Sequence, residues 1–164
     1  MVNNIFKNGI FGGIIAAAVM SSMVFYMKTN PGMQPNAVIG FISMLLAFSF
    51  LILGVKQQRE INNGTITFGK AFLTGLGISF IISTMYVLAW LVIFYNFFPD
   101  FIERYSEIVL KNTSPGELTA KTTEMNQMKE WYKSPLMVIL LTYMEIFPLG
   151  IVVSLIAGLI LKKK

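Results

Sequence analysis

Four apolar segments, each long enough to cross a lipid bilayer, constrain the fold of this chain more than any other feature of its sequence. They are residues 9–27, 37–55, 71–98 and 136–161. A helix needs about 20 apolar residues to span about 30 Å of hydrocarbon, and each segment meets that requirement. Because an irregular backbone cannot satisfy its hydrogen bonds in lipid, the sequence predicts a single all-α membrane domain of four transmembrane helices over residues 1–164.

The composition supports a membrane location. Hydrophobic residues make up 55% of the 164 positions and charged residues only 13%, whereas a soluble domain carries about 25% charged residues. The formal net charge of +5 comes from basic residues scattered near the ends of the apolar segments, which is typical of a protein at a membrane surface. We therefore expect the lipid bilayer as a partner and no nucleic acid.

The chain contains no cysteine and no histidine. The first absence excludes a disulfide framework, and the second removes the commonest general base and the commonest metal ligand. A lone carboxyl within the apolar segments offers no general acid–base pair. The sequence thus predicts neither an enzyme nor a metal or cofactor site.

Lysine and arginine gather in the short segments on one side of the membrane. With both termini cytoplasmic, the inner segments hold Lys7, then Lys56, Arg59 and Lys70, and finally Lys162–Lys164. The opposite side holds the long segment 99–135, whose acidic and basic residues nearly balance. The positive-inside rule therefore predicts two transmembrane hairpins with both termini in the cytoplasm. A signal peptide is the alternative for residues 9–27, but that run is long and a second apolar segment follows closely.

Asn63-Gly64 lies between the second and third apolar segments and is a strong turn signal, since both residues tolerate positive φ. One alternative is a small hairpin that pairs Ile61 with Ile66. The other is a simple reversal of the chain, with Thr67 capping the start of the third helix.

The segment 99–135 is patterned too regularly for a linker. Apolar residues from Phe101 to Val109 recur at helical spacing with charged residues between them. The run 114–117, Ser-Pro-Gly-Glu, has the form of a capping box with proline at the first helical position. The pattern predicts two amphipathic helices on the outer surface, which either shield the bundle or act as a lid or docking surface.

Small residues recur every four positions in three of the apolar segments. The rows are Gly9, Gly13, Ala17 and Ser21 in the first segment, Ala71, Gly75, Ser79 and Ser83 in the third, and Gly150, Ser154 and Gly158 in the fourth. Such rows let helix backbones approach closely in lipid, so we expect the first and third helices to touch along theirs. The matching rows fit an internal duplication of one hairpin, but all transmembrane hairpins share such features.

Glu145 lies alone inside the fourth apolar segment, about 14 Å from its start and hence near the membrane midplane. Ser83 and Thr84 fall at a similar depth in the third segment, and Thr142 precedes Glu145 by one turn. Since no Lys or Arg lies at this depth, we expect the carboxyl to point into the bundle, largely buried and neutral, beside such hydroxyls.

Pro148 interrupts the same helix one turn after Glu145. Proline has no N–H, so the carbonyl of Met144 loses its usual partner beside the carboxyl. Two interpretations stay open. Glu145 is either a proton- or cation-coupling site or a hydrogen-bonded carboxyl that fixes the register of the helices.

Two motifs resemble a known family. They are the run 63–72, Asn-Gly-Thr-Ile-Thr-Phe-Gly-Lys-Ala-Phe, and the run 145–150, Glu-Ile-Phe-Pro-Leu-Gly, ahead of a lysine-ended tail. Together with the order of the apolar segments and the long outer loop, these motifs are similar to the bacterial domain-of-unknown-function family 4199. The resemblance implies a four-helix protein of the bacterial inner membrane and implies no activity.

Two function classes follow from these features. The outer amphipathic helices and the lack of catalytic side chains favour a non-enzymatic accessory, scaffold or envelope protein, whose partner is another membrane protein or a second copy of the chain. The alternative is a small proton- or cation-coupled carrier, which Glu145, Pro148 and the possible duplication favour.

Overall fold

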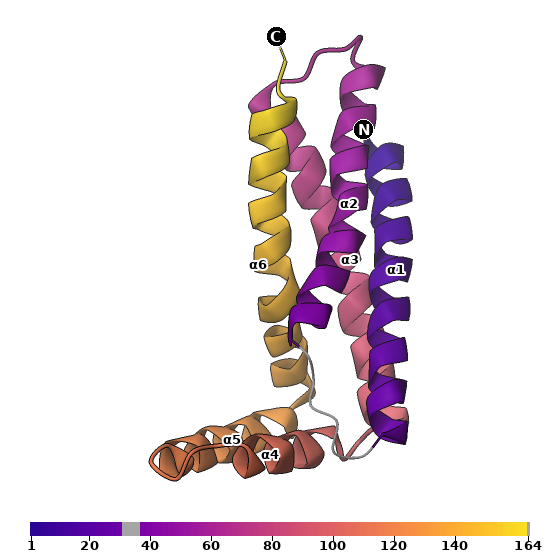
Figure 1. The fold of residues 1–164 in the computed structure, drawn as a ribbon. Coiled ribbons are helices and arrows are strands. Elements are labelled where there is room, and N and C mark those ends of the chain that lie inside the picture. Colours follow the sequence, from indigo (N-terminus) through magenta and orange to yellow (C-terminus); the bar gives the residue numbers. More distant parts are fainter. Residues whose placement is uncertain (31–36, 164) are drawn as a thin grey trace.

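The computed structural model describes residues 1–30 and 37–163 and contains six α-helices within those ranges. The helices are α1 (Val2–Thr29), α2 (Ala37–Ile61), α3 (Phe68–Asn96), α4 (Phe101–Lys111), α5 (Leu118–Tyr132) and α6 (Pro135–Leu161) (Figure 1). Four of them, α1, α2, α3 and α6, are long and apolar enough to cross a membrane. The structure therefore confirms the all-α class and the four long apolar helices that the sequence predicts.

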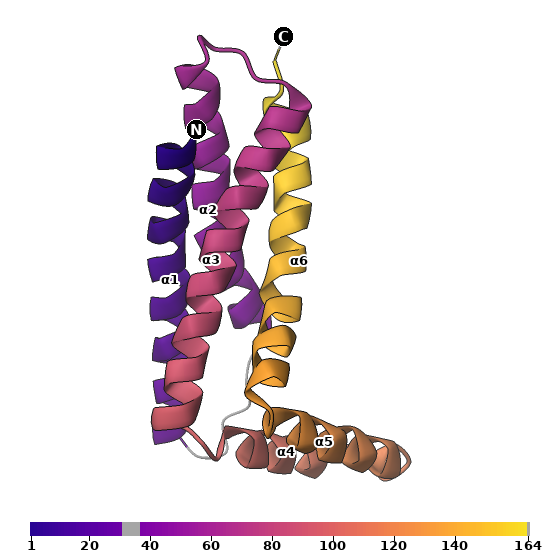
Figure 2. The same cartoon turned by 180° about the vertical axis from the view of Figure 1, so that it is seen from behind.

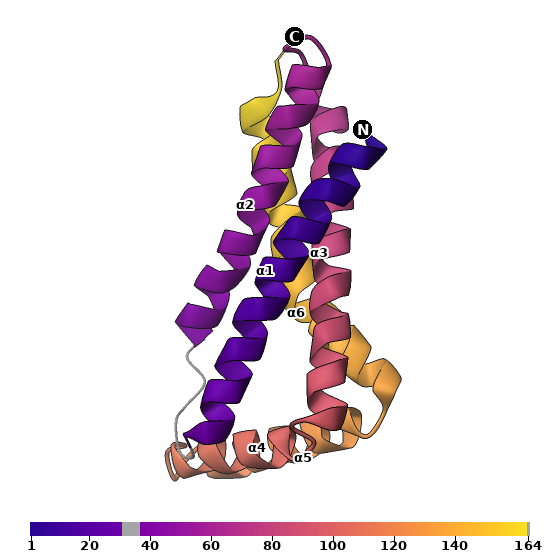
Figure 3. The same cartoon turned by 90° about the vertical axis from the view of Figure 1, so that its right-hand side faces the viewer.

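The four long helices form a bundle, and the two short helices lie across one end of it (Figures 1 and 2). Both termini and the turn between α2 and α3 lie at the opposite end. Helices α2 and α3 each pack against the other three long helices, and α3 makes its most extensive contacts with α1 and α6. Seen from the side, α4 and α5 run beneath the bundle (Figure 3).

The core of the bundle is apolar, and so is much of its outside. Phe48 and Leu51 of α2 and Ile78 and Ile82 of α3 are among the fully buried side chains. Large apolar side chains such as that of Leu73, which is 58% exposed, cover the outer faces of the same helices. An exterior of this kind exceeds the apolar patches of soluble proteins and suits lipid contact.

The small residues of α1 pack against α3, but not against its small-residue row. A Cβ atom on Gly9 would lie 2.7 Å from Ile81, and one on Gly13 would overlap the side chain of Met85. The two helices therefore touch as predicted, whereas the predicted pairing of their small residues is wrong. The glycines of α1 leave grooves, and large side chains of α3 fill them.

The small-residue row of α3 meets the row of α6 instead. A Cβ atom on Gly75 would lie 3.1 Å from Ser154 and also 3.1 Å from Leu51 of α2, and one on Gly150 would overlap the hydroxyl of Ser79. A row of small residues occupies a single face of its helix, so the row of α3 cannot pack against both α1 and α6. The similarity between the rows of α1 and α3 thus does not extend to their packing.

The turn after α2 follows the sequence signals. Asn63 and Gly64 have positive φ of 57° and 82°, and the Thr67 hydroxyl accepts a hydrogen bond from the backbone N–H of Lys70 at 3.4 Å. The simple reversal with a capping threonine is therefore confirmed. The small hairpin with Ile61 does not form, because Ile61 is the last residue of α2.

The capping box predicted before α5 does not form. Helix α5 begins at Leu118, and the hydroxyl of Ser114 hydrogen-bonds the carboxylate of Glu117 at 3.0 Å rather than a backbone N–H. The backbone N–H of Glu117 donates to the carbonyl of Ser114 at 3.0 Å. Pro115 and Gly116 are strong turn formers, so the segment makes a turn and the helix starts after it.

At the end of the bundle that holds the termini, the helices are joined by hydrogen bonds that the sequence did not predict. Asn4 of α1 donates to the carbonyl of Gly54 at 2.7 Å, and Asn8 donates to the Asn4 side chain at 2.7 Å. Ile66 and Lys163 exchange two backbone hydrogen bonds of 2.9 Å, which tie the end of the chain to the α2–α3 turn. Buried amides bonded in this way hold the helices together.

Candidate functional site

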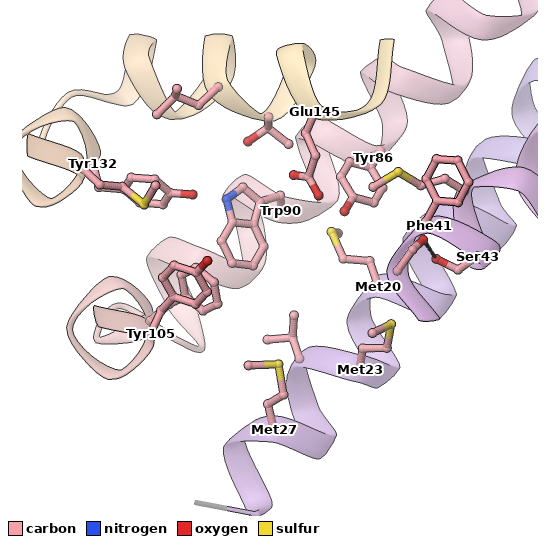
Figure 4. Close-up of a pocket in the computed structure, with 17 residues that line it drawn as sticks. Met20, Met23, Met27, Phe41, Ser43, Tyr86, Trp90, Tyr105, Tyr132 and Glu145 are labelled. Carbon is pink, nitrogen blue, oxygen red and sulfur yellow. Dashed lines mark hydrogen bonds between the residues drawn. The ribbon is translucent and has the colours of Figure 1, made fainter. Parts of the chain in front are cut away.

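A pocket of about 620 Å³ lies in the half of the bundle nearest α4 and α5. All six helices contribute to its wall, through residues such as Met20, Met44, Tyr86, Phe101, Tyr132 and Glu145. Its volume falls within the range of about 300–1,000 Å³ that is typical of small-molecule sites. The close-up view shows side chains of α1, α2, α3 and α6 turned toward a common space (Figure 4).

Glu145 is the one charged side chain among the described residues that line this pocket. Its carboxyl points toward Tyr86 and Trp90 (Figure 4). The side chain therefore points into the bundle, as expected, although the residue as a whole stays accessible. This turn of α6 faces the open pocket rather than a packed helix interface.

Thr142 lies beside Glu145 on the pocket wall but does not serve as its partner. The Thr142 hydroxyl donates to the carbonyl of Val138, one turn earlier in the same helix, at 2.7 Å. Within residues 1–30 and 37–163, no hydrogen bond or ion pair reaches the Glu145 carboxyl. Pro148, which we grouped with these residues, is exposed and lies outside the pocket wall.

Ser83 and Thr84 do not join the site, although their depth suggested that they would. Ser83 is fully buried, and its hydroxyl has no partner among the described residues. Thr84 lies 2.6 Å, oxygen to oxygen, from the hydroxyl of Tyr143 on α6 and does not line the pocket. Depth alone therefore placed these residues in the right layer, but they face other directions.

Aromatic side chains that sequence reasoning missed form much of the pocket wall. The rings of Trp90 and Phe101 meet edge to face with their centres 4.8 Å apart, and the ring of Tyr132 meets that of Phe94 in the same way at 5.3 Å. Burial raises the pKa of Tyr132 to about 12, with the charge of Glu145 adding to the effect. The Tyr132 phenol therefore stays neutral. Tyr86 and Trp90 are four residues apart, a spacing that could have indicated one shared face.

Methionines make up another part of the wall. They are Met20, Met23 and Met27 of α1, Met44 of α2 and Met128 of α5. The three in α1 recur at intervals of three and four residues, which places them on one helical face. The sequence carried this signal, but in an apolar segment it is hard to distinguish from lipid-facing residues.

The arrangement suits a single positive charge or a proton. Among the described residues, no group of three or more His, Cys, Asp or Glu side chains lies together. A carboxyl in an apolar pocket can exchange a proton with water, or it can attract a cation that enters the pocket.

Comparison with known proteins identifies the family of this chain. The family model described as "Protein of unknown function (DUF4199)" matches residues 7–163, which is nearly the whole chain, and the chain belongs to this family. No curated protein and no solved structure matches it. The match confirms the family that the two sequence motifs indicate. It assigns no activity, and the pocket is the feature of the structure that bears on function.

Proposed function

We propose that this member of the DUF4199 family is a small, non-enzymatic carrier of the bacterial inner membrane that is coupled to protons or another cation through Glu145. One observation carries the proposal. The carboxyl lines a pocket of about 620 Å³ and has no neutralising side chain among the described residues of the pocket wall. Ionisable residues inside membrane segments are costly, and they commonly mark ion or substrate pathways.

The proposed arrangement in the membrane follows from the distribution of charge. Helices α1 and α2 form one hairpin and α3 and α6 the other, with both termini cytoplasmic and α4 and α5 on the outer surface as amphipathic helices. The pocket then lies in the outer half of the bundle, while the hydrogen bonds of Asn4 and Asn8 close the inner half. A carrier exposes its site to one side of the membrane at a time, and α4 and α5 lie across the outer end of this site.

The test is ion flux in liposomes that contain the purified protein and an entrapped dye for the ion under test, which is pH-sensitive for protons and ion-selective for sodium or potassium. Proton, sodium and potassium gradients are imposed in turn. We expect the wild type to carry flux above that of empty liposomes. The variant Glu145→Gln should fall to the empty-liposome rate, because an amide cannot release a proton or balance a cation. Glu107→Gln is the matched control, since Glu107 is an exposed carboxylate of α4 outside the pocket wall, and it should keep the wild-type rate.

A wild-type rate equal to that of empty liposomes under every gradient would contradict the carrier proposal. Equal rates for Glu145→Gln and the wild type would show that any flux does not use this carboxyl. Either result would favour the second candidate, a non-enzymatic accessory, scaffold or envelope protein.

One observation supports that second candidate. Helices α4 and α5 extend sideways beyond the bundle (Figures 1 and 2), and their exposed faces carry ion pairs such as Lys121–Glu124 at 2.6 Å. Such a surface suits a membrane-protein partner or a second copy of the chain. A photo-crosslinking residue at exposed Gln127 should then capture a discrete partner in cells. Crosslinks to lipid alone would count against this candidate.

A further inference from the structure

We infer that the pocket around Glu145 binds an amphipathic organic cation, meaning a compound with one ammonium or phosphonium charge on an apolar body. The inference rests on the proposed function in one respect, because it names the class of ligand that the same site would take. It depends on the chemistry of the pocket wall and not on whether the ligand is transported.

The charge of the pocket wall favours a cationic ligand. Glu145 is the only charged side chain among the described residues that line the pocket. Two basic residues near this end of the bundle have other partners. Lys28 donates to the carbonyl of Phe97 at 2.5 Å, and Arg104 pairs with Asp100 at 2.6 Å. A charge that neutralises Glu145 is therefore most readily supplied by the ligand.

The oxygen atoms of the pocket wall favour an organic cation over a divalent metal ion. Mg²⁺ and Ca²⁺ take about six to eight oxygen ligands. Besides the Glu145 carboxyl, the side-chain oxygens of the pocket wall are hydroxyls. Those of Thr142 and Ser43 donate to the carbonyls of Val138 and Gly40 in their own helices, at 2.7 Å and 2.6 Å, and the others are the phenols of Tyr86, Tyr105 and Tyr132. Divalent ions of this kind are bound by carboxylates, carbonyls and water rather than by phenols. One carboxyl with only hydroxyls beside it is a poor metal site but a sufficient counter-ion for one ammonium group.

Aromatic rings line the pocket beside the carboxyl. The Glu145 carboxyl points toward Tyr86 and Trp90 (Figure 4), so a cation bound to the carboxyl would lie near their rings. The faces of such rings attract cations, and the attraction is strongest when water is excluded. Trp90 is held edge to face against Phe101 at 4.8 Å, which limits the conformational entropy that binding would cost.

The size of the pocket favours a ligand with an apolar body. A volume of about 620 Å³ is far larger than one ammonium group needs, so the apolar body of the ligand must fill the rest. Met20, Met23 and Met44 are among the apolar residues that line the pocket. Methionine is unbranched and polarisable, so it adapts to ligands of different shape. The pocket is therefore suited to a class of cations rather than to one compound.

The experiment measures binding of tetraphenylphosphonium to the purified protein in a non-ionic detergent. The chain has two tryptophans, and Trp131 is 36% exposed and lies outside the pocket wall. The background variant Trp131→Phe therefore leaves Trp90 as the only tryptophan reporter. We expect saturable quenching of its fluorescence by tetraphenylphosphonium. The neutral compound triphenylphosphine oxide should bind at least about tenfold more weakly.

Two pairs of variants in that background test the proposed contacts. Glu145→Gln should raise the dissociation constant of tetraphenylphosphonium at least about tenfold and leave that of the neutral compound unchanged. Glu107→Gln is its control and should bind as the background protein does. Tyr86→Leu should weaken binding by about threefold to tenfold through loss of the ring. Tyr95→Leu, which removes a 46% exposed ring of the same helix outside the pocket, should not.

Equal binding of the cation and the neutral compound would overturn the inference and would indicate an apolar pocket that accepts lipid or detergent. Absence of tetraphenylphosphonium binding by the wild type, or equal binding by the wild type and a folded Glu145→Gln variant, would overturn it as well. Because binding in detergent needs no gradient, this result is independent of the flux assay. Binding without flux would support the organic-cation site and contradict the carrier proposal. Glu145-dependent flux without binding would support the carrier proposal and contradict the organic-cation site.

Discussion

The carboxyl of Glu145 faces the pocket and has no hydrogen-bond partner among the described residues. A carboxyl that fixes the register of helices needs hydrogen bonds to a neighbouring helix, and within the described residues none is formed. Thr142, the nearest hydroxyl along α6, is bonded to Val138. One of the two interpretations that the sequence left open is that Glu145 fixes the register of the helices. The structure shows no contact of the carboxyl that would do so.

Because the Glu145 side chain makes no hydrogen bond whereas that of Asn4 does, substitutions of the two residues should differ in their effect on stability. Glu145→Gln should change the free energy of unfolding by no more than about 0.5 kcal/mol, since it removes no hydrogen bond. Asn4→Ala should cost about 1–3 kcal/mol, because it removes the buried hydrogen bond to the carbonyl of Gly54 and leaves the Asn8 amide without its acceptor on the Asn4 side chain. Thermal unfolding in one detergent compares the two variants with the wild type. A loss for Glu145→Gln as large as that for Asn4→Ala would restore the structural role of the carboxyl.

The interface between α3 and α6 depends on small residues at single positions. A Cβ atom on Gly150 would overlap the hydroxyl of Ser79 and would lie 2.9 Å from the ring of Phe48. Both neighbours are fully buried, so neither has room to move. A Cβ on Gly13 of α1 would instead meet the side chain of Met85, which is flexible and can turn aside.

We therefore predict that Gly150→Ala destabilises the protein by about 1–3 kcal/mol through overpacking. Gly13→Ala should cost less, because Met85 can move. Gly69→Ala is the matched control within a helix, since a Cβ there meets nothing within 4 Å, and it should be neutral or stabilising by up to about 1 kcal/mol. Melting temperatures of the three variants give the ranking. A Gly150→Ala variant as stable as Gly69→Ala would show that the two helices do not pack this closely.

The sequence predictions of helices and turns that the structure confirms rest on local signals. The length of the apolar segments located the four long helices. Asn63-Gly64 and Thr67 marked the reversal between α2 and α3 because each acts on its own backbone. The pairing of the small-residue rows failed because a sequence shows that a helix has a small face but not which helix covers it. The capping box at Ser114 failed because Pro115-Gly116 serves a turn as well as a helix start.

At the scale of the whole molecule, the pocket could not be predicted from the sequence. Counting along the apolar segments gave the depth of Glu145, Ser83 and Thr84, but depth says nothing about the direction in which each side chain points. That direction depends on how the helices are rotated against each other. The contribution of α4 and α5 also needed the fold, because Phe101 and Tyr132 reach the pocket only when both helices lie across the end of the bundle.

The orientation of the whole molecule in the membrane is open to a direct test. The structure places both termini and the Asn63 turn at one end and α4 and α5 at the other, and the excess of lysine and arginine at the first end predicts that it is cytoplasmic. The natural chain has no cysteine, so Asn63→Cys and Thr122→Cys each introduce a single thiol. In intact cells, an impermeant thiol reagent should label position 122 and not position 63, and after permeabilisation it should label both. Labelling of position 63 alone in intact cells would reverse the orientation and turn the pocket toward the cytoplasm.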